Sequence, residues 1–124
     1  MSAAQRRKGQ VGEREVARLI HDLLGCDVRR RVRNHADDSD LVGVPGWSVE
    51  IKNQRTVTRS LLRAWWQQTW QQAGDLRPVL VYKRGPAWWY AMWESPTLGA
   101  TIEGELAVWA TEVRENLPSD GIGG

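Results

Sequence analysis

The stretch "SDLVGVPGWSVEIKNQR" (residues 39–55) holds the pattern that decides the fold. Asp40–Val44 and Trp47–Asn53 each read as a short strand, because apolar residues dominate the first and alternate with polar residues in the second. Pro45 and Gly46 supply a turn between the two strands. The sequence therefore predicts a hairpin in which charged residues stand among residues that favour burial.

The second strand of this hairpin has a charged face. Side chains alternate along a strand, so Glu50 and Lys52 point away from the face of Val49 and Ile51. The hairpin would bring the Asp40 carboxylate beside that of Glu50, and two close carboxylates repel each other unless a cation compensates. Oxygen ligands without thiolate or clustered imidazole favour Mg²⁺ or Mn²⁺ over Zn²⁺. The plainer alternative is an ordinary Glu–Lys pair on a surface strand.

A helix with a carboxylate next to its apolar face precedes the hairpin. Val11–Leu24 has helical periodicity, and Gly25 supplies a stop. Glu13 lies at helical spacing from residues of an apolar face, so we expect its carboxylate to point inward. Glu15 shares a face with other apolar residues, and periodicity alone does not choose between the two carboxylates.

The remaining segments complete a mixed architecture. The predicted order is helix, three strands, helix, two strands, helix, which suggests a mixed sheet covered by helices. The further predicted elements are a strand at Cys26–Val32, a helix at about 60–73 behind a Thr58 or Ser60 cap, strands at 78–83 and 88–93, and a short helix near 103–116.

The composition is that of one globular domain spanning residues 1–124. Hydrophobic residues make up 41% and charged residues 26%, and no apolar run approaches membrane-spanning length. Residues 1–8 are predicted to form a mobile basic arm, and residues 118–124 a frayed tail. The first residues do not have the pattern expected of a secretory leader, so we expect none, and the single cysteine, Cys26, cannot form an internal disulfide. We therefore expect a reducing, intracellular setting.

Basic residues concentrate in the first half of the chain, although the net charge is only +2. The chain has fourteen Arg and three Lys, and Arg suits bidentate phosphate contacts. A polyanion such as nucleic acid and a plain solvated face explain the charge equally well. The candidate DNA-binding residues are Arg6, Arg7, Lys8, Arg29, Arg30, Arg31, Arg33, Arg55 and Arg59.

Eight tryptophans and no phenylalanine form an unusual aromatic set. Those at 65–70 and 88–93 cannot all face one small core, so we favour a dimer interface over base stacking for the surplus. Chance placement around the core is the simpler alternative.

Taken together, these segments resemble the PD-(D/E)XK nucleases, and within them the archaeal and phage Holliday-junction resolvases. "GQVGEREVARLI" is similar to the opening helix of that group, "SDLVGV" to its Asp-bearing strand, and "WSVEIKNQ" to its Glu-x-Lys strand. "AGDLRPVLVYKRGPAWWY" is similar to the later helix end and strand pair. The resemblance implies a restriction-endonuclease-like mixed α/β sheet of about five strands, magnesium dependence, a homodimer and the cytoplasm of a phage-infected or prokaryotic host.

The resemblance also implies roles for individual residues. Glu13, Asp40, Glu50 and Lys52 would be catalytic. Asp40, Glu50 and the backbone carbonyl of Ile51 would hold Mg²⁺, with Mn²⁺ as a substitute, and Glu13 would complete the shell through water. Lys52 would orient the attacking water and offset charge in the transition state.

The implied activity is hydrolysis of phosphodiester bonds at four-way DNA junctions by a metal-dependent endonuclease. One alternative is a RecB-like nuclease for DNA ends or flaps, because Gln67 or Gln68 weakly matches the Gln-x-x-x-Tyr element of those exonucleases. Another alternative is a DNA-binding module of the same fold that does not cut. An intact carboxylate set argues against a pure binder, since carboxylates repel phosphates.

Overall fold

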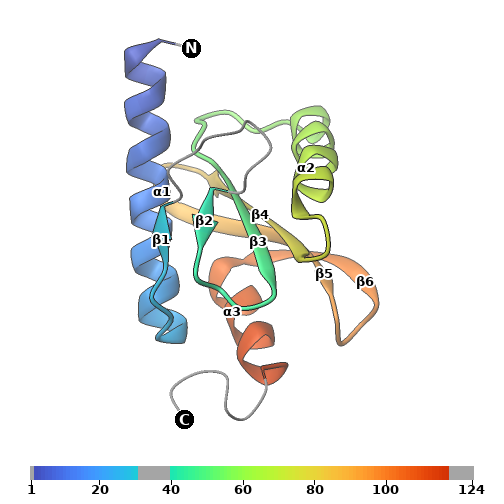
Figure 1. Ribbon diagram of the computed structural model, residues 1–124. Coiled ribbons are helices and arrows are strands. Elements are labelled where there is room, and N and C mark those ends of the chain that lie inside the picture. Colours follow the sequence, from blue (N-terminus) through green and yellow to red (C-terminus); the bar gives the residue numbers. More distant parts are fainter. Residues whose placement is uncertain (1, 31–39, 118–124) are drawn as a thin grey trace.

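Six strands form one mixed sheet in the computed structural model, which describes residues 2–30 and 40–117 (Figure 1). The strands follow the chain in order across the sheet. They are β1 (Arg29–Arg30), β2 (Leu41–Val42), β3 (Trp47–Lys52), β4 (Arg77–Arg84), β5 (Trp88–Ser95) and β6 (Ala100–Glu105). The helices are α1 (Ala3–Leu24), α2 (Arg59–Ala73) and α3 (Leu106–Glu115).

Strands β3 and β4 are parallel, whereas every other neighbouring pair is antiparallel. Helix α2 makes the crossover that a parallel pair requires, and it lies on one face of the sheet. Helices α1 and α3 cover the opposite face (Figure 1). This mixed α/β sandwich is consistent with the restriction-endonuclease-like fold expected from the sequence.

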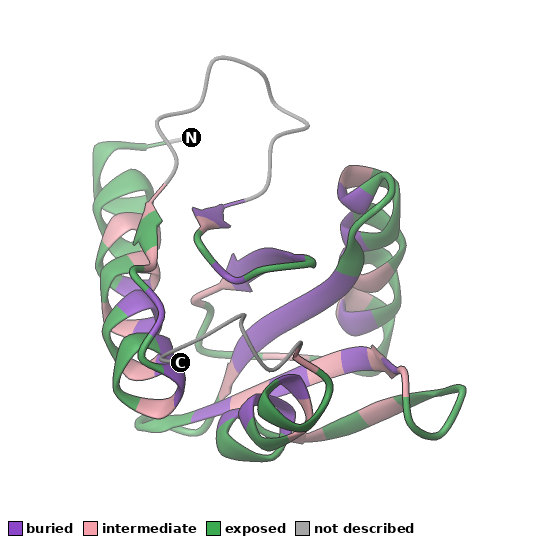
Figure 2. Cartoon of the chain, turned by 60° about the horizontal axis from the view of Figure 1, so that its bottom comes forward, coloured by how far each residue is buried: buried purple, intermediate pink, exposed green. Residues whose placement is uncertain are grey.

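Each face of the sheet has its own hydrophobic core. Helices α1 and α3 pack on the face of β3 that carries Val49 and Ile51. On the other face, Leu62 and Trp65 of α2 pack against Leu80 and Tyr82 of β4. Figure 2 shows that buried residues concentrate on the central strands and on the sides of the helices that face them.

Helix α1 is longer than its apolar periodicity predicts. It begins at Ala3, because Ser2 caps the first turn in a capping box with Gln5. Most of residues 1–8, which we expected to form a mobile arm, are therefore helical. The predicted tail at 118–124 lies outside the described residues. The helix ends at Leu24, and Gly25, the predicted stop, caps it with a left-handed backbone.

Glycine at position 12 allows α1 to approach the end of β3. A Cβ atom added there would lie 2.7 Å from Cβ of Asn53, closer than real carbon contacts. The Asn53 side chain also donates a hydrogen bond to the carbonyl of Lys8 (2.9 Å). The helix is thus fixed against the segment that follows Lys52, with Glu13 next to the contact.

The edges of the sheet differ from the sequence prediction. Strand β1 covers only two residues of the predicted 26–32, and its predicted end lies outside the described residues. The predicted helix at 103–116 begins three residues too early, because Ala100–Glu105 forms a sixth strand against β5. This strand alternates exposed and half-buried residues and lies at the sheet edge, so it lacks the apolar content that identifies inner strands.

The structure corrects our interpretation of the tryptophans. Five are buried, because two separate cores share them: Trp47, Trp65, Trp89, Trp93 and Trp109. Trp66 is half-buried, and Trp70 and Trp88 are 47% and 63% exposed. Within the described residues, a broad tryptophan surface is therefore not left over for a dimer interface.

A carboxylate on α3 ties this helix to the sheet. Glu112 accepts hydrogen bonds from Nε1 of Trp93 and Oγ of Ser95 (2.5 Å each) and from the backbone N–H of Thr97 (3.2 Å). Burial raises the pKa of Glu112, but these hydrogen bonds outweigh it and lower the pKa below its ordinary value of 4.5.

Replacing Glu112 by Ala should lower the free energy of unfolding by about 2–3 kcal/mol, because the donors of buried Trp93 and Ser95 lose their acceptor. Chemical denaturation at pH 7 measures the loss, with exposed Glu115→Ala one turn away as the control. A carboxylate with a depressed pKa stabilises the fold above its unfolded-state pKa. The difference between wild type and Glu112→Ala should therefore shrink as pH falls below 4.5. Equal stability of the two proteins at pH 7 would contradict this role.

Candidate active site

Asp40 binds β3 on both sides of Glu50. Its backbone N–H donates to the carbonyl of Val49 (3.0 Å), and its carboxylate oxygen Oδ2 accepts from the N–H of Ile51 (2.7 Å). The Asp40 carboxylate thereby takes the place of a strand carbonyl just before β2 begins. Asp40 and Glu50 are only 4% and 3% exposed, although carboxylates are rarely buried. The structure thus brings two of the predicted catalytic residues, Asp40 and Glu50, together.

Lys52 joins this pair from the same strand. It lies two residues after Glu50 and hence on the same face, and its Nζ is 3.9 Å from Oε1 of Glu50. The lysine side chain is 23% exposed, whereas that of Glu50 is 4% exposed, so the ammonium group lies closer to solvent than the carboxylate. Asp40, Glu50 and Lys52 form what we call the carboxylate–lysine group.

Glu13 is not part of this group. It lies on α1, which packs on the opposite face of β3, and its Oε1 accepts from Nε of Arg30 (2.9 Å) in a half-buried ion pair. Glu15, the other candidate on this helix, accepts from Nε1 of Trp89 (3.0 Å) and lies 4.0 Å from Nζ of Lys83. Both carboxylates therefore have basic or donor partners, and Glu13 is the one near the end of β3 that carries Lys52.

Two carboxylates are available for the Mg²⁺ site that the sequence predicts. Among residues 2–30 and 40–117, no three His, Cys, Asp or Glu side chains lie close enough to hold a metal ion. Mg²⁺ typically uses one or two carboxylates and keeps several waters. The two buried carboxylates of Asp40 and Glu50 match this requirement, with the Ile51 carbonyl as the predicted third oxygen.

Several predicted DNA-binding residues lie on segments at the same end of the molecule as the end of β3. The exposed residues of the N-terminal part of α1 and of the segment before α2 lie at this end of the molecule (Figure 1). They are Arg6, Arg7 and Lys8 on α1, Arg55 on the segment before α2, and Arg59, the first residue of α2. Arg29 is exposed on β1, where Arg30 is instead ion-paired with Glu13. Arg31 and Arg33 lie outside the described residues.

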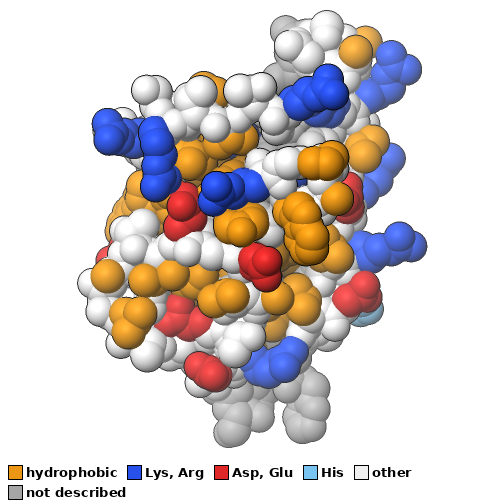
Figure 3. All heavy atoms as spheres, turned by 180° about the vertical axis from the view of Figure 1, so that it is seen from behind, with side chains coloured by type: hydrophobic (Ala, Val, Ile, Leu, Met, Phe, Trp, Pro, Cys, Tyr) orange, Lys and Arg blue, Asp and Glu red, His pale blue; other side chains and the backbone are white. Residues whose placement is uncertain are grey.

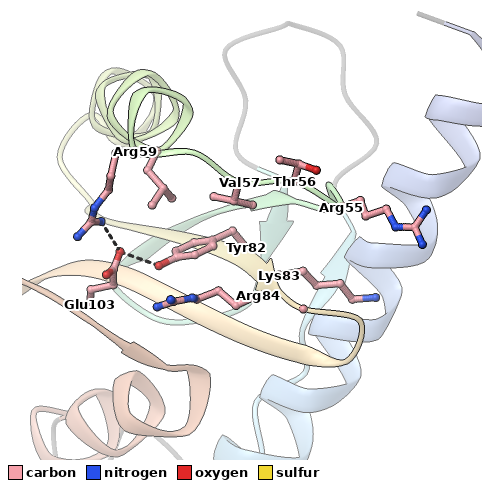
Figure 4. Close-up of a pocket in the computed structure, with 10 residues that line it drawn as sticks. Arg55, Thr56, Val57, Arg59, Tyr82, Lys83, Arg84 and Glu103 are labelled. Carbon is pink, nitrogen blue, oxygen red and sulfur yellow. Dashed lines mark hydrogen bonds and ion pairs between the residues drawn. The ribbon is translucent and has the colours of Figure 1, made fainter.

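Sequence reasoning missed a second group, on the α2 face of the sheet. A pocket of about 510 Å³ lies between the start of α2 and the ends of β4 and β6 (Figure 4). Arg84, Tyr82 and Glu103 contribute to its lining beside the predicted Arg55 and Arg59. The Arg-Gly-Pro turn after β4 was the available sequence signal, but Glu103 was assigned to a helix.

Two features bear on the alternatives. Gln67 and Gln68, the weak match to RecB-type exonucleases, are both exposed on α2. In the described part of the chain, no helix has the length and apolar content needed to cross a bilayer.

Comparison with known proteins agrees with this geometry. No curated protein and no solved structure matches the chain. Residues 4–117 match the family described as "Phage putative PDDEXK endonuclease", which confirms the expected superfamily. Because this match covers nearly all of the 124 residues, the chain belongs to that family and is a nuclease of the PD-(D/E)XK superfamily.

Proposed function

We propose that this nuclease is a Mg²⁺-dependent, structure-selective DNA endonuclease that cuts four-way junctions. The observation that carries the proposal is the carboxylate–lysine group at the end of β3, with exposed basic residues on the N-terminal part of α1 and on the segment that leads into α2. Two buried carboxylates and a lysine beside a basic surface are a combination that suits hydrolysis of a phosphodiester. A protein that only binds DNA gains nothing from buried carboxylates near phosphates.

The residues of the chain divide the work. Asp40 and Glu50 would hold Mg²⁺, or Mn²⁺ in its place, and the hydrogen bond from Ile51 fixes the Asp40 carboxylate for this role. A divalent ion bound there supplies polarisation of the scissile phosphate and a lower pKa of bound water. Lys52 would orient the attacking water and offset the negative charge that develops on the phosphate oxygens.

Glu13 would have an indirect role in catalysis. It lies on α1, which packs on the opposite face of β3, and it pairs with Arg30, so it would contribute through water, as the sequence resemblance implies. Arg30 would at the same time position the Glu13 carboxylate near the end of β3.

The substrate class is tested by comparing DNAs of one sequence and different shape. A gel assay with a four-way junction, a flap and a plain duplex should show the highest cleavage rate on the junction. Faster cutting of the flap or of free ends would replace this proposal by the RecB-like alternative. Binding of all three without cleavage in Mg²⁺ or Mn²⁺ would favour the non-catalytic alternative.

Resolution of a junction needs two nicks on opposing strands, whereas each chain offers one carboxylate–lysine group among its described residues. We therefore propose a symmetric homodimer, whose interface should bury at least about 1,000 Å². Figure 3 shows hydrophobic side chains in separate groups on the rear face, with charged side chains between them. An interface on this face would be mixed in character.

Light scattering at micromolar concentration should report about twice the chain mass of 14.1 kDa. The same measurement with junction DNA should report one dimer on each junction, since two sites related by a two-fold axis serve the two strands. A protein that is monomeric at all concentrations, and still nicks junctions symmetrically, would rule out the homodimer.

A further inference from the structure

The pocket beside α2 lies on the same face of the sheet as the carboxylate–lysine group. Strand register pairs Glu50 with Leu80, Leu80 with Met92, and Met92 with Glu103. Residues directly opposite each other share a face, so Glu50 and Glu103 stand in one row. Three strand spacings separate them, about 14 Å. Helix α2 covers Leu80 between them, so DNA bound near Glu50 would reach the pocket around the start of α2 and not along the row.

Two guanidinium groups converge on Glu103 in this pocket. Arg59 Nη1 lies 3.2 Å from Oε2 of Glu103, and Arg84 extends across the pocket floor toward the same carboxylate (Figure 4). The Arg84 guanidinium also lies 4.9 Å from the centre of the Tyr90 ring, a contact that orients it. Arg55 and Lys83 point away toward α1, and Nζ of Lys83 lies over the Trp89 ring instead.

The third polar group of the pocket is a neutral donor. The hydroxyl of Tyr82 donates to Oε2 of Glu103 (2.7 Å), and Tyr82 is only 1% exposed. Burial and then the contact with Glu103 raise the pKa of Tyr82 well above its ordinary value, so the phenol stays protonated. The pocket thus has two cations and a hydroxyl that can bind an anion. In the structure, the Glu103 carboxylate is that anion.

We propose that this pocket binds a phosphate group of the DNA strand, separate from the phosphate that is cut, with Arg59 and Arg84 as ligands and Glu103 as a built-in competitor. Guanidinium groups suit phosphate because they donate in pairs. A volume of about 510 Å³ leaves room for a phosphate together with Glu103. The competing carboxylate weakens capture of free phosphate, so only a phosphate tethered to bound DNA reaches a high local concentration.

This inference rests on the proposed action on DNA, and DNA binding without cleavage tests it separately. Binding of junction DNA is measured in EDTA over a range of salt concentrations. Arg59→Ala and Arg84→Ala should each reduce the slope of log affinity against log salt by about one, as expected for one lost phosphate contact. Arg63→Ala on α2 and Arg77→Ala at the other end of β4, both exposed and outside the pocket, serve as matched controls.

A gain of binding gives the second readout. Glu103→Gln keeps a hydrogen-bond acceptor for Tyr82 but removes the competing charge, so it should tighten DNA binding about three- to tenfold. Glu105→Gln, exposed two residues further on β6, is its control. The tighter binding of Glu103→Gln can be measured whether or not the arginine variants fold well. Thermal melts check the folding of those variants independently.

DNA ends identify which phosphate is bound. If Arg59→Ala and Arg84→Ala weaken binding equally for DNAs with and without terminal phosphates, the pocket takes an internal phosphodiester. If they weaken binding only of end-phosphorylated DNA, it takes a terminal phosphate. Slopes equal to those of the controls, with no gain in Glu103→Gln, would overturn the pocket assignment alone. Failure of the wild type to bind any DNA would overturn the proposed function as well.

Discussion

Replacing Asp40 by Asn, or Glu50 by Gln, should reduce DNA cleavage by at least about 10²- to 10³-fold, the effect of losing one group that acts on transition-state charge. Both side chains are almost fully buried at the end of β3, and Lys52 lies 3.9 Å from Glu50. Either amide keeps the shape of the carboxylate but removes a charge that would hold the metal. The measurement is the single-turnover rate on the preferred DNA in Mg²⁺.

Binding should respond in the opposite direction. Each substitution removes a negative charge near the DNA phosphates, so affinity in EDTA should stay the same or increase. An Asn at position 40 can still accept the hydrogen bond from Ile51, which predicts a preserved fold. Asp75→Asn and Glu115→Gln, at exposed positions elsewhere, are matched controls with wild-type cleavage. Cleavage near the wild-type rate by either Asp40→Asn or Glu50→Gln would remove the carboxylate–lysine group from the mechanism.

The central hairpin could be predicted from sequence because its pattern is local. β3 spans Trp47–Lys52, within the predicted Trp47–Asn53, because alternation of apolar and polar residues indicates a strand, although both faces of β3 are buried. Placing Asp40 beside this strand required only a short turn at Gly46, whose φ is +83°. The three residues of the carboxylate–lysine group were predictable for the same reason.

The position of Glu13 could not be settled by periodicity, which left Glu13 and Glu15 equivalent. Their separation depends on which strands lie on either side of α1. Glu13 faces Arg30 on β1, whereas Glu15 faces Trp89 on β5. Contacts between elements so far apart in sequence leave no local pattern.

The pocket was hidden for a related reason. It forms only if Glu103 lies in a strand, β6, that is separated from β4 by one other strand. However, β6 is an edge strand with few apolar residues, so its sequence was interpreted as the start of a helix. Tyr82 and Glu103 are 21 residues apart and meet only after β5 has paired with both neighbours. The predicted surplus of tryptophans on the surface was wrong because a sheet with a core on each face accommodates more aromatic side chains than a single core.

Removing divalent metal should abolish cleavage, and Mg²⁺ or Mn²⁺ should restore it. Two buried carboxylates on neighbouring strands repel each other and any approaching phosphate, and the single ammonium group of Lys52 offsets only part of that charge. Activity is measured after treatment with EDTA and again after each ion is returned. Full activity in EDTA would exclude a metal-dependent mechanism.

Ca²⁺ separates binding of the ion from chemistry. It is larger and tolerates irregular coordination, so we expect it to support DNA binding without turnover. A ligand that binds only the folded state raises its stability, by about 2.7 kcal/mol at 100 times the Kd. Ca²⁺ or Mg²⁺ should therefore raise the melting temperature of the wild type but not of Asp40→Asn, whereas Glu115→Gln should respond like the wild type. An equal rise in Asp40→Asn would place the bound ion away from Asp40, and the assignment of this carboxylate as a metal ligand would then be wrong.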